Sequence, residues 1–410
     1  MNSRRELLRR AIALLPLLAS GRTAAMSDAP NTDRDIAAAI ERWDGFGIHR
    51  TGTDADAATG RWLRDAAAAL GHEAQLEPFP FRRRTPTAAT LTLADGTRIG
   101  GVPLFDGGQC PEGLEAVLGD APDQIAVLRT PPYDSMPGAR ALDDARHAAT
   151  HPAIVAVTDD RMVRSGLALL NAEAFHAPFG PPVLQVGSEH LERLEGARGG
   201  TARMHIAFEQ TRVEASNVRV DVAGRDPSLA PVVVITPRSS WWHSTSERGG
   251  GIALWLDLLA HFAAHPPRRP MVFTANTGHE LGHVGMQRFL DVEEALVGSA
   301  HCWVHLGANF AAVAPGQVRI QASSAELMAA MDRALESERV AVGARTEVGT
   351  PPYGEARDIH AGGGAYVSIL GTNGLFHHPD DRWPDSVDLP RTLAIAAAFR
   401  ALVGAIAEQV

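Results

Sequence analysis

Four short stretches of this sequence collect the side chains that metal binding and acid–base chemistry require. Together they hold a dense set of His, Glu and Asp residues, at 237–251, 276–283, 307–309 and 374–381. The first three directly follow apolar runs that we predict to be strands, at 232–236, 271–275 and 302–306. Because sites in open α/β sheets form at the carboxyl ends of strands, we expect these side chains to meet at one edge of a sheet. Any one of them taken alone is more simply a solvated loop residue.

The segment His279-Glu280-Leu281-Gly282-His283 also matches the H-E-x-x-H pattern of zinc-binding helices. On a helix this spacing places two imidazoles on one face, with a glutamate base between them. Here a predicted strand and Thr277-Gly278 come immediately before His279, which would therefore lie at the start of a helix. The structural context that the motif needs is missing, so we do not assign a zincin-type site to it.

The elements that must position these residues alternate between strands and helices after Asn217. We predict a further strand at 218–222 and helices at 251–264, 281–289, 292–296, 325–338 and 389–409. Ser323 and Glu326 have capping-box spacing at the start of the fourth helix. Apolar strands separated by helices imply an α/β sheet that is covered on both faces.

The first half of the chain has two further patterns. Two amphipathic helices are predicted between Asp33 and Gly71, followed by a strand at 73–79. From about 86 to 210 the pattern changes to short β-like runs separated by Gly and Pro turns, with one helix at 139–149. This spacing is typical of a small strand-rich module inserted into a larger domain.

Composition excludes several functional classes. All 38 basic residues are arginine, which excludes a Schiff-base lysine and a Walker-type phosphate loop. The net charge of −10 argues against a nucleic-acid partner. The two cysteines, Cys110 and Cys302, are too few for a Cys-ligated zinc or an iron–sulfur cluster. They could form one disulfide in an exported protein, and the sequence leaves this open.

The N-terminus predicts export. Ser3-Arg4-Arg5-Glu6-Leu7-Leu8 precedes an apolar run at 11–19 and the small residues Thr23-Ala24-Ala25. Residues 1–25 therefore resemble a twin-arginine signal peptide, and we expect a periplasmic or secreted protein. The alternative is a basic amphipathic helix of the mature chain. We expect no membrane span, because we find no later apolar stretch of the roughly eighteen residues that a span needs.

Taken as a whole, the chain resembles the zinc aminopeptidases of metallopeptidase family twenty-eight, a group that includes glutamate carboxypeptidase and glutaminyl cyclase. Residues 246–253 stand where the family has N-D-N-A-S-G-V-A, residues 277–282 where it has G-G-E-E-L-G, and residues 376–381 where it has Y-H-T-P-E-D. His49 to Thr53 is similar to the family's opening. The segment around Pro182–Val186 resembles a protease-associated domain.

This resemblance implies a domain organisation and a sheet type. Residues 26–85 and 211–410 would form the aminopeptidase-like domain, and residues 86–210 the inserted, β-rich protease-associated domain. The central sheet of the larger domain would be mixed and mostly parallel, with helices on both faces.

Carried over residue by residue, the resemblance also implies an altered metal site. The family's first-metal histidine falls near Pro237, its later aspartate ligand on Gly307 and its catalytic glutamate on His279. What remains is Glu247, Glu280 and His377, which the resemblance implies as the metal ligands. Two carboxylates and an imidazole have the composition of a catalytic site for one zinc with an open water position. His279 would then be the general base, since a neutral imidazole accepts a proton near pH 7.

Charged neighbours complete the expected site. Arg238 and Arg248 are permanent cations beside it, which favours a substrate that brings a carboxylate or phosphate. The expected substrate-binding residues are Arg238, His243, Arg248 and Arg357. Asp380 or Asp381 would orient His377 through its second ring nitrogen. If Glu247 pairs with an arginine instead of a metal, the centre would be metal-free.

Three functions follow from these residues. The first is an exported hydrolase of an amide or peptide-like bond that uses one zinc. The second is a non-catalytic pseudo-peptidase that binds a peptide or an anionic ligand with Trp241, Trp242, His243 and the two arginines. The third is acyl transfer by Ser244 or Ser246, although no nucleophile-elbow motif supports it. The substrate and the oligomeric state are left open.

Overall fold

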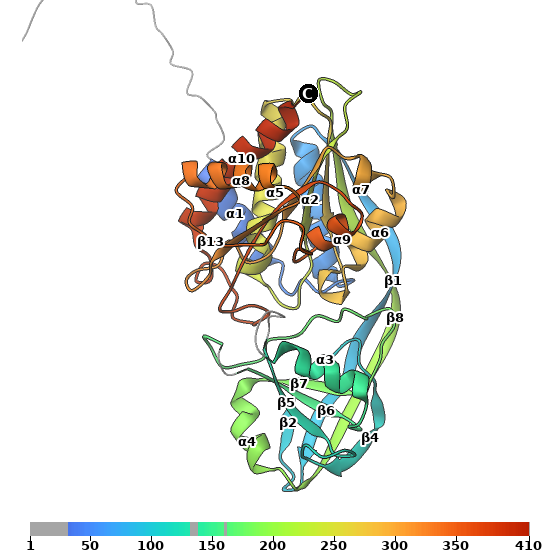
Figure 1. Cartoon of the computed structure of the whole chain (residues 1–410). Helices are drawn as coiled ribbons and strands as arrows, with labels where there is room; N and C mark the ends of the chain where they lie inside the picture. The colour runs from blue at the N-terminus through green and yellow to red at the C-terminus, as the bar shows by residue number, and fades with distance from the viewer. Residues whose placement is uncertain (1–31, 132–137, 160–161, 410) are drawn as a thin grey trace, which may run out of the picture. The chain divides into compact units, whose positions relative to one another are not determined.

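The apolar segments of the second half form the centre of a ten-stranded mixed sheet (Figure 1). The computed structural model describes residues 32–131, 138–159 and 162–409, so the expected signal peptide lies outside the described residues. The strand order is β13 (Val342–Arg345), β12 (Val318–Ala322), β14 (Tyr366–Gly371), β11 (Cys302–Leu306), β9 (Val232–Pro237), β10 (Met271–Asn276), β8 (Thr201–Val222), β1 (Glu73–Leu93) and β2 (Arg98–Gly100), and β4 (Cys110–Val117) also pairs with β8. The four central strands, β14 to β10, run parallel, whereas β8, β1 and β2 pair antiparallel.

Alternation along β9 shows how helices cover both faces of this sheet. Val232 and Val234 point into one core, which is completed by α1 (Thr32–Gly45), α2 (Asp54–Ala69), α5 (Gly250–Ala264), α8 (Ala325–Ser337) and α10 (Leu389–Glu408). Val233 and Ile235 point to the opposite face, beneath α6 (Val284–Val292), α7 (Leu296–Ser299) and α9 (Ala356–Ala361). Successive strand residues face opposite sides, so a strand buried on both faces must be apolar throughout. The predicted fold class, a mixed sheet with a parallel centre and helices on both faces, is confirmed.

A second, four-stranded sheet lies within the segment predicted as an insert. Its order is β3 (Val102–Pro103), β7 (Val183–Val186), β6 (Ile154–Thr158) and β5 (Ala126–Thr130), with α3 (Ala139–Ala148) and α4 (Leu191–Gly196) beside it in the chain. The predicted boundaries after residues 85 and 210 fall inside β1 and β8. These two strands pair without a break from Glu73 to Leu93, apart from a register shift between Pro86 and Ala88. The division into two domains therefore stays a prediction.

Helix starts differ from the prediction where the backbone turns left-handed. The helix expected at 281–289 begins only at Val284, because Gly282 and His283 have φ values of 75° and 60°. The helix expected at 292–296 is instead the end of α6 and the start of α7. The cap of α8 is Ser324, whose hydroxyl accepts from the backbone N–H of Leu327, and not Ser323 as the capping-box spacing predicted.

Two other expectations concern the cysteines and the membrane. Cys110 and Cys302 are both free and buried, which answers the question of a disulfide that the sequence left open. By length and composition α10 is apolar enough to cross a membrane, contrary to the expectation from sequence. Its buried residues, among them Phe399 and Val403, pack into the core beside the sheet, and core helices of this kind pass the same test.

A buried ion pair fastens α2 to the sheet. Arg238, directly after β9, donates through Nη1 to Asp56 Oδ1 at 2.6 Å and through Nη2 to the carbonyl of Ser216. The carboxylate of Asp56 also accepts from Gly52 N and from Thr277 Oγ1, each at 2.8 Å. Arg238 is fully buried. Its position gives it a packing role, so the expected part in substrate binding does not match the structure.

We predict that Arg238→Met destabilises the fold by about 3–5 kcal/mol, because it leaves the Asp56 carboxylate buried without its cation. Urea unfolding of the purified protein measures this. The matched control is Arg225→Met, which breaks an exposed pair with Glu408 and should change stability by less than about 1 kcal/mol. Equal effects of the two substitutions would contradict the packing role.

Candidate active site

All four predicted stretches meet at the carboxyl ends of the parallel strands, and in the stretch after β11 the backbone N–H of Asn309 donates to the carbonyl of Glu247 at 3.0 Å. The stretch after β9 forms a π-helical turn, Thr245–Gly249, and the stretch after β10 forms a 3-10 turn, His279–Leu281. The loop after β14 brings His377 and Asp381 to the same place. Because β10, β9, β11 and β14 are neighbours in the sheet, their following loops must converge there.

The π-helical turn is held by Asp381. Its carboxylate accepts from Ser246 N at 2.8 Å, from Ser246 Oγ at 2.7 Å and from Glu247 N at 3.1 Å. Burial raises the pKa of Asp381 to about 6, against the effect of these hydrogen bonds. The hydroxyl of Ser246 thus donates to a carboxylate and not to an imidazole, which gives acyl transfer by Ser246 no support.

Glu247 and Arg248, adjacent in that turn, form a buried ion pair. Arg248 Nη2 lies 2.9 Å from Glu247 Oε1, and His377 Nε2 lies 3.6 Å from the same oxygen. Burial alone would raise the pKa of Glu247, but Arg248 and His377 outweigh it and lower the pKa to about 2. The carboxylate is therefore ionised at neutral pH. This is the pairing with an arginine that the sequence allowed for a metal-free centre.

Hydrogen bonding around this pair is incomplete. Arg248 Nε donates to the carbonyl of Ser239 at 3.2 Å. Both terminal nitrogens of Arg248 and both carboxylate oxygens of Glu247 are buried without a hydrogen-bond partner in the described structure. Buried groups of this kind normally have partners, so the pair retains capacity for a ligand or for water.

Glu280 is used differently from the prediction. Its Oε1 accepts from the backbone N and the hydroxyl of Thr51, at 2.8 and 2.7 Å, and its Oε2 accepts from Ser239 Oγ at 2.6 Å. Glu280 is fully buried, and burial raises its pKa. Within the described residues, Glu247, Glu280 and His377 do not form a group whose ligand atoms all lie within 4.8 Å of one another. The expected metal trio therefore does not converge.

The remaining predicted residues lie around this pocket. His377 Nδ1 contacts the carbonyl of Leu169 at 2.6 Å, so neither Asp380 nor Asp381 orients that ring, contrary to the prediction. Asp380 instead pairs with Arg164 at the surface, at 3.0 Å. His243 is half-buried, and its carbonyl accepts from Trp43 Nε1 at 2.9 Å.

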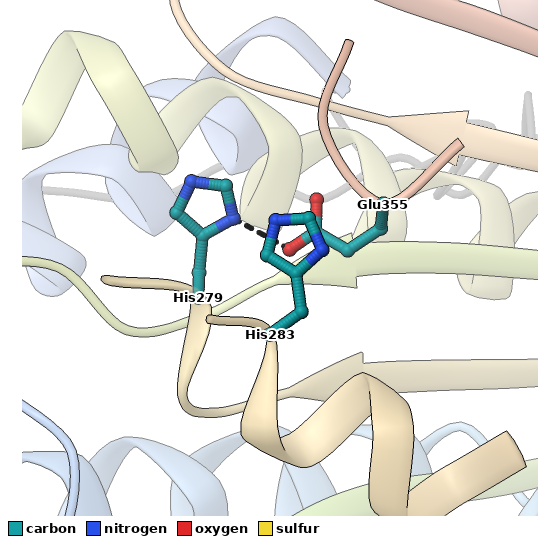
Figure 2. Close-up of side chains that lie close together, drawn as sticks. All are labelled: His279, His283 and Glu355. Carbon is teal, nitrogen blue, oxygen red and sulfur yellow. Dashed lines mark hydrogen bonds and ion pairs between the residues drawn. The ribbon is translucent and has the colours of Figure 1, made fainter. Parts of the chain in front are cut away.

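A different set of ligand atoms does converge beside the pocket. His279, His283 and Glu355 place one ligand atom each within 4.8 Å of the others, and all three are buried (Figure 2). His279 Nδ1 lies 2.6 Å from Glu355 Oε1, and the two imidazoles stack with centroids 5.0 Å apart. We call these three residues the His–Glu cluster. Among the described residues, no other group of three His, Cys, Asp or Glu side chains brings its ligand atoms this close together.

The two histidines come together through a turn and not along a helix. Gly278, Gly282 and His283 all have positive φ values, so the chain folds back within one 3-10 turn and returns His283 to the side of His279. The H-E-x-x-H spacing was therefore the available sequence signal for this pair, although its helical geometry is absent. Glu355 follows a Gly- and Pro-containing loop and lies two residues before Arg357, an expected substrate-binding residue, but no motif marked Glu355 itself.

Electrostatics around Glu355 favour a charged carboxylate and a neutral His279. Burial would raise the pKa of Glu355, but His279 and His283 hold it well below its ordinary value. Burial, assisted by Arg248, lowers the pKa of His279 to about 4. A neutral imidazole is the form that binds a metal or accepts a proton. A third imidazole, His305 Nε2, lies 3.2 Å from Glu355 Oε2.

The cluster has the donor chemistry of a zinc site. Two imidazoles and one carboxylate are the protein ligands of many catalytic zinc sites. His283 Nδ1 lies 2.8 Å from Asp358 Oδ2, the outer carboxylate that orients metal-binding histidines. Arg357 Nη2 lies 3.5 Å from His283 Nε2, and its charge is balanced by Glu173 at 2.5 Å. The donor set of the cluster therefore fits a divalent ion.

The loop that contains Thr51, the residue that donates to Glu280, is held in place by the buried His49. His49 stacks on Trp43 with centroids 3.6 Å apart, and its Nε2 lies 3.0 Å from the Trp43 carbonyl. Burial lowers the pKa of His49 from 6.5 to about 3. The folded protein therefore keeps this ring neutral at a pH where the unfolded chain protonates it.

We predict that His49 makes the fold acid-sensitive. Below about pH 6.5 the unfolded chain binds one more proton than the folded protein, so stability should fall by roughly 1.4 kcal/mol per pH unit down to about pH 3. Urea unfolding at a series of pH values measures the slope, which should be shallower in His49→Gln. The exposed His265 serves as control, since His265→Gln should leave the slope unchanged; a steep slope retained in His49→Gln would contradict the prediction.

Comparison with known proteins adds little at the level of sequence. No family model matches the chain. A curated relative, the vacuolar membrane protease of Vanderwaltozyma polyspora, is 35% identical over 93 residues, which is 22% of this chain. The match spans only 10% of that protein's length.

Solved structures match over nearly the whole chain. BSAP, a zinc aminopeptidase from Bacillus subtilis, has a TM-score of 0.74 at 15% identity, covering 92% of this chain and 95% of that one. A peptidase M28 precursor from Shewanella amazonensis gives 0.72 at 16% identity, with the same coverage. An aminopeptidase from Aneurinibacillus sp. strain AM-1 gives 0.66 at 13%, covering 92% and 94%. The chain therefore has the fold of the zinc aminopeptidases of metallopeptidase family twenty-eight, the family that its motifs resemble.

Proposed function

We propose that this protein is an exported hydrolase of an amide or peptide-like bond, and that it holds a single zinc ion in the His–Glu cluster. The observation that carries the proposal is the convergence of His279, His283 and Glu355 at the ends of the parallel strands. The peptidase fold supports the reaction class. Fold alone does not establish activity, which depends on the site.

Each neighbouring residue has a defined task in this proposal. Zinc, when bound, lowers the pKa of a coordinated water and polarises a carbonyl. His305 and Asp358 hold Glu355 and His283 in place through the contacts described above. The free nitrogens of Arg248 can donate to a carboxylate or an oxyanion on the substrate.

In this proposal the role of general base passes from His279 to His377. His279 was the expected general base, but as a zinc ligand it has no lone pair to spare. His377 approaches Glu247 to 3.6 Å, and both histidines lower the pKa of that carboxylate, so the two imidazoles face the same group. Should the protein hydrolyse amides without metal, His279 would keep its expected role, oriented by Glu355.

One observation favours the alternative of a non-catalytic pseudo-peptidase that binds a peptide or an anionic ligand. The guanidinium of Arg248 lies against Glu247 through Nη2, and its Nη1 is buried without a hydrogen-bond partner among the described residues. Glu280, the glutamate that the family resemblance assigned to the metal, has both oxygens occupied by Thr51 and Ser239. A cation with free donors is suited to binding an anion whether or not a reaction follows.

We predict about one zinc per chain in protein purified from the exported fraction, measured by mass spectrometry of the metal. His283→Gln and Glu355→Gln should each lose most of it, because two protein ligands bind zinc far more weakly than three. Glu280→Gln is the matched control and should keep the metal, since its oxygens bind Thr51 and Ser239. Circular dichroism confirms that each variant is folded.

The outcomes separate the possibilities. Loss of zinc in Glu280→Gln together with retention in His283→Gln would return the site to the trio expected from the resemblance. A metal-free wild type that binds anions and turns over no amide substrate would leave the pseudo-peptidase.

We predict further that export depends on Arg4 and Arg5. Replacing both with lysine should keep the chain inside the cell, because the twin-arginine pathway reads that pair. Cell fractionation with detection of the protein measures this. Replacing Arg9 and Arg10 with lysine preserves the same charges outside the motif and should leave export intact; equal export of both variants would argue for another route.

A further inference from the structure

Three arginines converge on a small pocket next to the candidate active site. Arg50, on the loop after α1, and Arg83 and Arg84, on β1, line it together with the rings of Phe81, Phe105 and Phe175. We call these six residues the arginine pocket. None of the three arginines was among the residues expected to form a site.

The positive charge of this pocket is not balanced by nearby acids. In the described part of the chain, none of the three guanidinium groups lies within 4.0 Å of a carboxylate. The acids that act on them electrostatically are Glu280, on Arg50, and Asp106, on Arg84. Asp106 is already paired with Arg146 at 2.9 Å, and Glu280 is bound by Thr51 and Ser239.

Among the described residues, most N–H groups of these three arginines have no hydrogen-bond acceptor. Arg83 Nη1 donates to the carbonyl of Gly52 at 3.0 Å, and Arg84 Nη1 donates to the carbonyl of Phe105 at 2.5 Å. Arg83 Nε is buried without a partner. A guanidinium has five N–H donors, so each of these arginines retains several.

Aromatic rings fix the guanidinium groups in place. Arg50 lies 5.2 Å from the Phe105 ring centroid, and Arg84 lies 6.0 Å from Phe175 and 5.3 Å from Phe208. Stacking on a ring occupies the face of a guanidinium and leaves its N–H edge available. The arrangement is therefore preorganised to receive an acceptor.

We propose that the arginine pocket binds an anionic group, a carboxylate or a phosphate, of a ligand whose remainder stays outside the pocket, because the cavity holds only about 10 Å³ and its phenylalanine rings are buried. Three unpaired cations repel one another at short range, and an anion placed between them removes that cost. Planar carboxylates and phosphates match the paired N–H donors of arginine. The pocket does not depend on the proposed zinc.

The position of the pocket connects it to the site. Thr51, next to Arg50, donates two hydrogen bonds to Glu280, and Leu281, next to Glu280, also lines the pocket. An anion bound by Arg50 would thus lie beside Thr51, the residue whose hydrogen bonds hold Glu280.

Isothermal titration calorimetry on the mature protein tests the proposal with three probes: inorganic phosphate, N-acetylphenylalanine and N-acetylphenylalanine amide. Arg84→Gln and Arg50→Gln should each weaken binding of the anionic probes about tenfold or more, because each removes a charge-assisted contact. The amide should bind weakly to every variant. Arg82→Gln is the matched control, since Arg82 is exposed on the same strand and outside the pocket.

The outcomes distinguish a peptide-like carboxylate from free phosphate as the ligand, and two of them would overturn the proposal. Tighter binding of N-acetylphenylalanine than of phosphate supports a peptide-like carboxylate, and the reverse supports a free phosphate; both support the pocket. An equal loss in Arg82→Gln and Arg84→Gln would mean general electrostatic attraction and overturn it, as would no binding to the wild type. If Arg84→Gln unfolds, Arg50→Gln, on a separate loop, decides alone. None of these readouts involves metal content, so the proposed zinc can fail independently.

Discussion

A guanidinium buried against a carboxylate determines the character of the candidate site. Arg248 is a permanent cation, and enclosing it would be costly without Glu247 at 2.9 Å. Its charge keeps Glu247 ionised and helps to keep His279 neutral. A divalent ion on Glu247 would have to share that carboxylate with Arg248 at close range. The cation thus makes the pocket around Glu247 an unfavourable place for a divalent ion, which is why we assign the proposed zinc to the adjoining His–Glu cluster.

With the pocket occupied in this way, the acids around it take other tasks. Glu280 becomes a structural acceptor that joins the Thr51 loop to the turn after β10. Asp381 holds the π-helical turn through Ser246 and Glu247. The carboxylate of Glu355 is shared by two imidazoles, with His279 at one oxygen and His305 at the other. Glu280 and Asp381 thus have hydrogen-bond donors from neutral groups in place of a metal.

Sequence reasoning placed the central strands β9, β10 and β11, where burial on both faces demanded apolar residues, but it missed β14, which is buried in the same way. The runs at 232–236 and 302–306 were recognisable strands because both of their faces pack against helices. β12 was not, since Arg319 and Gln321 interrupt its apolar residues. The buried Gln321 is satisfied by Ser368 Oγ, on β14, and by the carbonyl of Tyr353. Such pairing between distant segments leaves no periodic trace in the sequence.

The location of the site was predictable from the sequence, but the pairing of its side chains was not. In the structure Glu247, His279 and His377 follow β9, β10 and β14, at the sheet edge where the motifs placed their loops. Motif spacing could not decide that Arg248 would turn toward Glu247, because that depends on the π-helical geometry of a five-residue turn. Nor could it find Glu355, whose proximity to His279 spans 76 residues of chain. Contacts of that length are set by tertiary packing alone.

The net charge of the chain bears on how the arginine pocket would attract an anion. With 48 acidic residues against 38 basic ones, the protein's long-range field repels anions. An anionic ligand would not be steered to Arg50, Arg83 and Arg84 by that field, and most of it is screened beyond about 10 Å in salt. Binding would have to come from short-range donors held by aromatic stacking. Local geometry, and not net charge, is therefore what would make such a pocket selective for an anion over the neutral form of the same ligand.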